Sequence, residues 1–96
     1  MVVNNLLIKL KQRDADSIQA AVDILNKLQG NIPVLLDSKV ETDVNCGSSG
    51  YDIMLINTFD KYEDIQTYLV HPVHVEVSDY IQDIIDSAAS LCYEVK

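Results

Sequence analysis

Apolar residues change their spacing along this chain in an order that is compatible with few folds. Apolar residues crowd and alternate near the start as in a strand, then recur every three or four residues as on one helix face. Two strand-like stretches, two further helical stretches and a short β-prone tail follow. The predicted order is β-α-β-β-α-α-β, with strands at 2–10, 35–44, 52–59 and 90–95 and helices at 14–29, 60–71 and 73–88.

Polar residues, glycine and proline predict where the helices begin and end. Asp14 or Asp16 supplies an N-cap for the first helix, and Gly30 is a natural stop after it. Asp60 is predicted to cap the second helix. Pro72 interrupts the helical pattern because the residue before a proline is pushed out of the α region.

This order is the ferredoxin-like plan of an α+β domain, here with its second helical segment broken in two. It predicts one domain spanning residues 1–96, with an antiparallel sheet and helices packed on one face. The stretch 52–59 is largely apolar on both faces, so the sheet face away from the helices also needs a cover. A second copy of the chain is the simplest cover, which predicts a homodimer through the sheet face.

Charge and hydropathy exclude several classes of partner. Fifteen Asp and Glu against seven Lys and Arg give a formal net charge of −8, which repels phosphate backbones and anionic lipid. No apolar run approaches the roughly 18 residues of a membrane span, and no signal peptide is recognisable. We therefore expect a cytoplasmic protein that binds neither nucleic acid nor membranes. The two cysteines, Cys46 and Cys92, are expected to be free thiols.

One segment concentrates residues that could carry chemistry. Tyr68, His71 and His74 lie around Pro72, and these are the only histidines of the chain. Histidine titrates near neutral pH and serves as a general acid or base, while a nearby tyrosine can donate to a carbonyl oxygen. The structural alternatives are that His71 binds the helix carbonyls freed by Pro72 and that Tyr68 is a core aromatic.

Motifs for other chemistries are absent. The sequence has no dinucleotide or phosphate loop, no zinc protease motif and no calcium loop, so no cofactor is expected. Glu76, Asp79, Asp83 and Asp86 form an acidic stripe on the predicted last helix. Carboxylates at this spacing are typical of a solvated helix face, and we predict no metal site there.

The pattern Tyr68-x-x-His71-Pro72-x-His74-x-x-Val77 resembles the signature of the stress-responsive A/B-barrel family, also called Dabb. The resemblance covers nearly the whole chain. It includes Lys9-Leu10-Lys11, Ile32-Pro33, Tyr51-Asp52, Phe59, Tyr62 to Ile65, and Tyr93 in the last strand.

The resemblance implies a dimeric α+β barrel with a small-molecule pocket. Family members similar to plant polyketide cyclases use the Tyr and the second His of the motif, which match Tyr68 and His74. It implies acid–base catalysis on a polyketide-like or aromatic substrate, with His71, Asn4 and Tyr93 as binding or supporting residues. Asn4 stands where members often carry a His, and Cys92 where they often carry an Asp; both changes leave fewer ionisable groups than a cyclase needs.

The sequence leaves the choice between catalysis and binding open. The alternative to an enzyme is a non-catalytic dimeric module that binds a small apolar or aromatic ligand or is associated with stress. A third possibility is an amino-acid-binding regulatory domain of the same plan. That domain would carry a glycine-rich loop after the first strand, and residues 11–14 contain no glycine.

Overall fold

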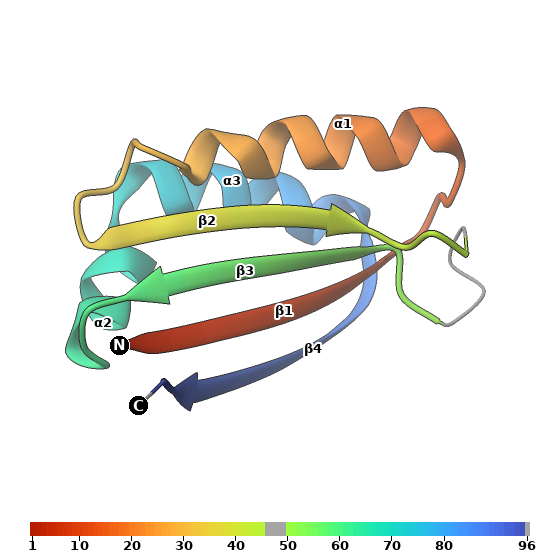
Figure 1. Cartoon of the computed structure of the whole chain (residues 1–96). Coiled ribbons are helices and arrows are strands. Elements are labelled where there is room, and N and C mark those ends of the chain that lie inside the picture. Colours follow the sequence, from red (N-terminus) through yellow and green to blue (C-terminus); the bar gives the residue numbers. More distant parts are fainter. Residues whose placement is uncertain (46–49, 96) are drawn as a thin grey trace.

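The predicted alternation of strands and helices folds into one antiparallel sheet with helices against it (Figure 1). The computed structural model describes residues 1–45 and 50–95. The strand order is β2-β3-β1-β4, as in a ferredoxin-like α+β fold, which confirms the predicted fold class. The elements are β1 (Val2–Leu10), α1 (Ala15–Leu25), the 3₁₀ turn η1 (Asn26–Leu28), β2 (Leu35–Thr42), β3 (Ile53–Phe59), α2 (Glu63–Val70), α3 (Pro72–Ile84) and β4 (Ile85–Glu94).

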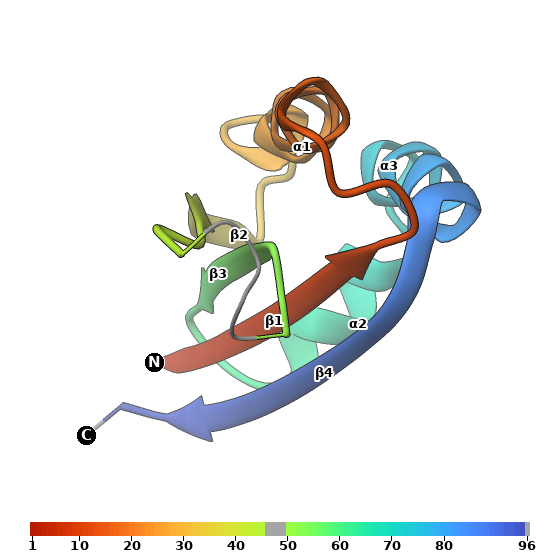
Figure 2. The ribbon, with the colours of Figure 1, turned by 90° about the vertical axis from the view of Figure 1, so that its right-hand side faces the viewer.

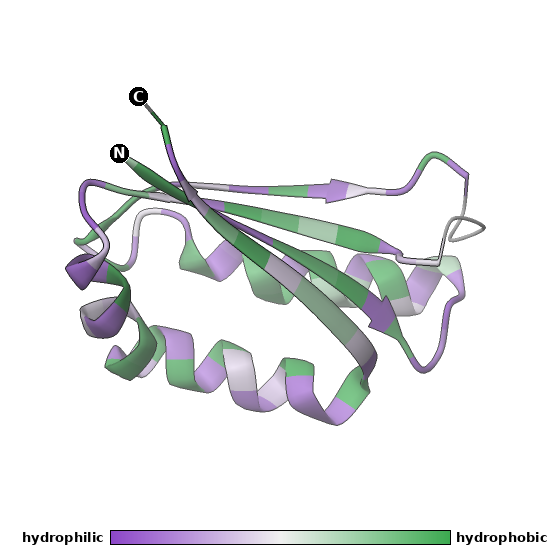
Figure 3. Ribbon diagram, turned by 90° about the horizontal axis from the view of Figure 1, so that it is seen from below, coloured by the Kyte–Doolittle hydropathy of each residue, from purple (hydrophilic) through white to green (hydrophobic). Residues whose placement is uncertain are grey.

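The helices form a second layer on one side of the twisted sheet. Figure 2 shows α1 and α3 side by side on that side, and α2 lies near the end of the sheet where β3 finishes (Figure 1). In Figure 3 the two layers face each other, with hydrophobic residues along both. Alternate strand residues point into the space between the layers. The largest fully buried apolar side chains there are Ile8, Leu10, Leu28, Ile32, Ile53 and Phe59.

The predicted N-cap of α1 is present, but α1 ends at Leu25 and not at the predicted residue 29, and the 3₁₀ turn η1 follows it. Asp14 is the N-cap: its carboxylate accepts from the Ser17 backbone N–H at 2.8 Å and from the Ser17 hydroxyl at 3.0 Å. These bonds stabilise the charged form and lower the pKa of Asp14. Asp16, the other candidate, lies in the first turn. Gly30 has a φ of +80°, a left-handed conformation that suits glycine.

Two other predictions at the ends of elements are wrong. Helix α3 ends at Ile84 and β4 begins at Ile85, five residues before the predicted start of the last strand. The long central strand β1 imposes this, because β4 pairs with it from Leu10 back to Val2. Asp60 does not cap α2, since Tyr62 precedes that helix without a side-chain capping bond.

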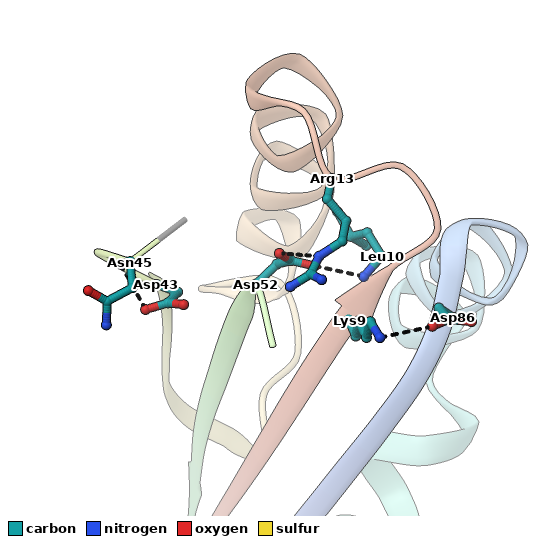
Figure 4. A network of polar contacts seen from close by, with 7 residues as sticks. All are labelled: Lys9, Leu10, Arg13, Asp43, Asn45, Asp52 and Asp86. Carbon is teal, nitrogen blue, oxygen red and sulfur yellow. Dashed lines mark hydrogen bonds and ion pairs between the residues drawn. The ribbon is translucent and has the colours of Figure 1, made fainter. Parts of the chain in front are cut away.

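The buried carboxylate of Asp52, just before β3, binds the end of β1 and the loop that follows it (Figure 4). The side chain of Asp52 accepts from the Leu10 backbone N–H at 2.9 Å and from Arg13 Nε at 3.1 Å. The Asp52 side chain is fully buried, whereas that of Arg13 is 34% exposed. A buried carboxylate is stable only with such partners, so these contacts hold the loop after β1 in place.

The sheet face away from the helices is apolar, as the sequence predicted. In the pairing of β1 with β3 and β4, Leu7 lies opposite Met54 and Ala89, and Asn5 lies opposite Ile56 and Leu91. The helices are all on the other side (Figure 2). We refer to this surface as the open sheet face; its central and β4 side chains are Val3, Asn5, Leu7, Met54, Ile56, Ala89, Leu91 and Tyr93.

Some further expectations concern membranes, thiols and metals. Within residues 1–45 and 50–95, no helix combines the length and hydropathy required to cross a bilayer. Cys92 is an exposed free thiol, and Cys46 lies outside the described residues. Over the same described ranges, the carboxylate, histidine and cysteine side chains form no group of three placed to hold a metal ion.

Candidate functional site

His71 separates α2 from α3, and Pro72 is the first residue of α3. His71 has φ −67° and ψ 136°, an extended conformation, as predicted for a residue before proline. Its Nδ1 accepts a hydrogen bond from the Val73 backbone N–H at 3.1 Å, which makes His71 the N-cap of α3. The His71 side chain therefore binds an amide of the helix that follows it, while its backbone N–H donates to the Tyr68 carbonyl oxygen of α2 at 3.2 Å.

His74 lies in the first turn of α3, and its ring is hydrogen-bonded to α2. Its Nδ1 is 3.0 Å from the carbonyl oxygen of Leu69. A carbonyl can only accept, so Nδ1 carries the proton in this bond. In the neutral ring this leaves Nε2 with its lone pair, as the nitrogen that can take a proton from a ligand.

Tyr68 is buried between the sheet and α3, next to His74. Its ring meets that of Phe59 edge to face at a centroid distance of 5.2 Å. Its ring centroid is 4.4 Å from that of His74, with the two planes inclined by 52°. The structure thus brings together the two residues that the sequence analysis named as a Tyr/His pair.

Polar residues of the sheet hold the Tyr68 hydroxyl. Asn57 of β3 donates from Nδ2 to Tyr68 Oη at 3.1 Å, and Ser38 of β2 donates from Oγ to Asn57 Oδ1 at 2.6 Å. Gln29 Oε1 in turn accepts from the Ser38 backbone N–H at 2.6 Å. Because Asn57 uses an acceptor position of Oη, the phenolic proton is free for another acceptor. Burial raises the pKa of Tyr68 to about 12, so the hydroxyl stays protonated at neutral pH.

Tyr68 and His74 both line a cavity of about 190 Å³ between the sheet and α3. The cavity is mostly apolar, and its walls come from β1, β3, β4, α1, η1, α2 and α3. They are formed by Leu6, Ile8, Leu25, Leu28, Leu55, Tyr68, His74, Val77, Ser78, Ile81, Gln82 and Ile85. We call it the Tyr68–His74 pocket. An apolar cavity with a few polar groups at one point is the usual form of a small-molecule site.

The other three residues named from the sequence do not line this pocket. Asn4 lies opposite Asn57 in the sheet register, but the β1 residues that line the pocket are Leu6 and Ile8. Tyr93 pairs with Val3, so it belongs to the open sheet face and is 44% exposed. His71 is half-buried and binds α3.

A larger cavity lies elsewhere on the molecule. It measures about 520 Å³ between the start of α1 and the end of α3, and its polar walls include Lys11, Asp16, Tyr80 and Asp83. Lys11 Nζ already donates to the carbonyl oxygen of Asp83 at 3.4 Å. Volume alone does not define a functional site. Tyr68 and His74, the two side chains that could act as acid and base, line the cavity of about 190 Å³. We therefore take the Tyr68–His74 pocket as the candidate site.

Ser38 and Asn57 belong to the site but were not predicted from the sequence. Asn57 alternates with Ile53, Leu55 and Phe59, so it faces the core, and it is only 2% exposed. A lone polar residue on the core face of a strand needs a buried partner, and this was the signal in the sequence. Its partners could not be named without the register, which places Ser38 opposite Asn57 on β2.

Comparison with known proteins agrees with this architecture. The family model for the stress responsive A/B barrel domain matches residues 4–95. No curated protein matches the chain in sequence. Among solved structures, a dimeric ferredoxin-like protein of unknown function from Bacteroides fragilis is 24% identical, with a TM-score of 0.82 over 98% of this chain and 95% of that chain.

Two further structures show the same fold at lower identity. A dimeric ferredoxin-like protein of unknown function from Thermobifida fusca is 18% identical, with a TM-score of 0.85 over 98% of this chain and 90% of that one. The hydroxynitrile lyase from Passiflora edulis is 17% identical, with a TM-score of 0.82 over 99% of this chain and 93% of that one. At these identities the likeness concerns the fold, while the family match spans nearly all residues. The chain belongs to the stress-responsive A/B-barrel (Dabb) domain family.

Proposed function

We propose that the Tyr68–His74 pocket binds a small apolar molecule with a carbonyl group and moves a proton on it by acid–base catalysis. The observation that carries the proposal is the contact of the two rings, 4.4 Å apart, at the wall of one apolar cavity. A hydroxyl that stays protonated and an imidazole with a free nitrogen are complementary groups for this chemistry.

The size of the pocket restricts the ligand. An apolar cavity of about 150 Å³ is enough to hold one benzene ring. At about 190 Å³, the pocket has room for one ring with a small substituent. This favours a single aromatic ring over an extended poly-β-keto chain, within the polyketide-like or aromatic class that the family resemblance implies.

The two side chains have distinct roles in the proposal. Tyr68 donates its proton as a hydrogen bond to the carbonyl oxygen, because Asn57 already occupies an acceptor position of Oη. His74 Nε2 takes a proton from the carbon next to the carbonyl, and the C–H electron pair moves into the enolate that Tyr68 stabilises. Returning the proton from Nε2 to that carbon restores the ketone and the neutral imidazole. His71 has no part in the step, since its Nδ1 is bound to α3.

Hydrogen exchange on a simple aromatic ketone tests this chemistry. Acetophenone in D₂O should exchange its methyl protons for deuterium faster with the protein than without it, as followed by proton NMR. His74→Asn and Tyr68→Phe should each reduce the catalysed exchange by about 100-fold. His71→Asn is the matched control and should leave the rate unchanged. Catalysed exchange that survives both pocket substitutions would disprove the acid–base roles, and binding without exchange would favour the non-catalytic ligand-binding module.

We further propose that the protein is a homodimer joined through its open sheet face. Ferredoxin-like neighbours of similar fold are described as dimeric. The face carries Leu91 at 66% exposure and Tyr93 at 44%, and large exposed apolar surfaces of this kind mark interfaces. Sedimentation equilibrium at micromolar concentration should give about twice the chain mass of 10.7 kDa. A monomer at that concentration would refute the dimer.

A further inference from the structure

Helix α3 contributes two rows of residues to the wall of the Tyr68–His74 pocket. Val77 and Ile81 form an apolar row and are only 3% and 7% exposed. His74, Ser78 and Gln82 line the same pocket and follow one another at intervals of four residues. Residues four apart lie one above the other on a helix face. These three side chains therefore form a polar row along the cavity.

Gln82 reaches back along this row toward the acid–base pair. Its Nε2 donates to Ser78 Oγ at 3.4 Å, in keeping with the lean of helix side chains toward the N-terminal end of their helix. The amide therefore lies near the level of Ser78, which is about 6 Å from His74 along the helix axis. A ligand of one aromatic ring, with its carbonyl group at Tyr68, is long enough to reach this amide.

The Gln82 amide offers the ligand an acceptor. Because Nε2 donates to Ser78, Oε1 is the atom left to accept. Among the residues that the structure describes, none donates a hydrogen bond to this oxygen. Gln82 is exposed, so water solvates Oε1 until a ligand takes its place.

The rest of the described pocket wall has no competing polar group. Apart from Tyr68 and the polar row, its side chains are all apolar: Leu6, Ile8, Leu25, Leu28, Leu55, Val77, Ile81 and Ile85. Taking a ligand hydroxyl out of water costs free energy unless the hydroxyl finds a hydrogen-bond partner. A ring that carries both a carbonyl and a hydroxyl is therefore held with the carbonyl at Tyr68 and the hydroxyl at Gln82.

We propose that Gln82 binds a ring hydroxyl of the ligand, so that the pocket selects aromatic ketones with a hydroxyl para to the carbonyl group. This inference rests on the proposed function and narrows its substrate class. The phenolic O–H donates to Gln82 Oε1, while the carbonyl oxygen at the other end accepts from Tyr68. Gln82 determines specificity and takes no part in the proton transfer, because it contacts the ring away from the carbon that His74 deprotonates.

Two probes of nearly equal shape, 4′-hydroxyacetophenone and 4′-fluoroacetophenone, test this assignment. Only the hydroxy ketone can donate a hydrogen bond from its para position. NMR titrations at neutral pH give the ratio of the two affinities, in which the different hydration of the probes is the same for every variant. Gln82→Leu should shift this ratio against the hydroxy ketone by about 3- to 10-fold. Its affinity for the fluoro ketone should stay within about twofold of wild type.

Two further variants separate the hydrogen bond from a change of shape. Gln82→Glu retains an acceptor oxygen, so it should keep the wild-type ratio or favour the hydroxy ketone further. Gln66→Leu, the same substitution at an exposed position of α2 outside the pocket, is the matched control and should leave the ratio unchanged. Acetophenone lacks the hydroxyl, and its deuterium exchange in Gln82→Leu should stay within about twofold of the wild-type rate. Circular dichroism checks that each variant is folded.

Three results would overturn the inference. They are an unchanged ratio in Gln82→Leu, a shift in Gln82→Glu as large as that in Gln82→Leu, and a loss of acetophenone exchange in Gln82→Leu. The first two leave the proposed function standing as long as acetophenone binds through Tyr68. Failure of all three ketones to bind the wild type would instead refute the proposed function itself.

Discussion

The side-chain amide of Asn57 donates to the hydroxyl of Tyr68 across 3.1 Å, and both residues are buried. Asn57→Leu removes this donor and also leaves the Ser38 hydroxyl without its acceptor. We expect a loss of about 1–3 kcal/mol in the free energy of unfolding, measured by urea denaturation.

Thr58→Val is the control for Asn57, because Thr58 is the next residue of β3 and points to the other face. Its effect on stability should stay within about 0.5 kcal/mol. An Asn57→Leu variant as stable as the control would show that the amide does not hold the Tyr68 hydroxyl.

Burial of Tyr68 also predicts how stability changes in alkali. Its pKa rises from 10.0 to about 12 on folding, so the unfolded chain loses this proton first as the pH rises. The contribution of Tyr68 is complete below pH 10 and is lost as the pH rises through about 12. Relative to Tyr68→Phe, the wild type should lose about 1 kcal/mol of stability between pH 9 and pH 11. If the difference in unfolding free energy between wild type and Tyr68→Phe stayed constant across that range, the burial of a protonated Tyr68 would be contradicted.

The two histidines should respond differently to substitution. His71→Ala removes the acceptor at the N-cap of α3 and should lower stability by about 1 kcal/mol, whereas His71→Asn keeps an acceptor and should lose much less. Neither change should affect ligand binding at the Tyr68–His74 pocket. Thermal unfolding and a ligand titration check the two statements, and equal stability of the alanine and asparagine variants would exclude the capping role.

Asp52 and Asp86 provide a comparison of a buried and an exposed carboxylate. Asp52→Ala leaves the Leu10 backbone N–H without its acceptor and should cost about 2–4 kcal/mol. Asp86→Ala breaks the exposed pair with Lys9 and should cost under about 1 kcal/mol, an effect that disappears in high salt. Chemical denaturation of both variants at two salt concentrations measures these losses. Similar losses in the free energy of unfolding would contradict the burial of Asp52.

Local signals in the sequence were sufficient to predict most of the fold. The apolar spacing of residues 18–28, the cap at Asp14 and the break at Pro72 act within a few residues, so they can be read without tertiary information. The change from α3 to β4 was misplaced because residues 85–89 carry no strong local preference. Their conformation is decided by pairing with β1, a contact between distant parts of the chain.

The candidate site was predictable only in part for the same reason. Tyr68 and His74 are six residues apart, and a helix break between them can bring both to one cavity. Asn57 and Ser38 join that site through strand register, which spacing along the chain does not specify. Tyr93 was expected to support the site, but the strand register places it on the open sheet face. A shift of one residue in a strand moves a side chain to the opposite face.

Binding of a matched pair of ligands shows whether the Tyr68 hydroxyl binds a carbonyl group in the pocket. Acetophenone and ethylbenzene have nearly the same shape, but only acetophenone has a carbonyl oxygen that can accept from Tyr68. In NMR titrations, Tyr68→Phe should weaken acetophenone binding by about 3- to 10-fold and leave ethylbenzene binding within about twofold of wild type. If the substitution changed the affinity for both ligands equally, or for neither, the Tyr68 hydroxyl would not be the carbonyl-binding group of this pocket.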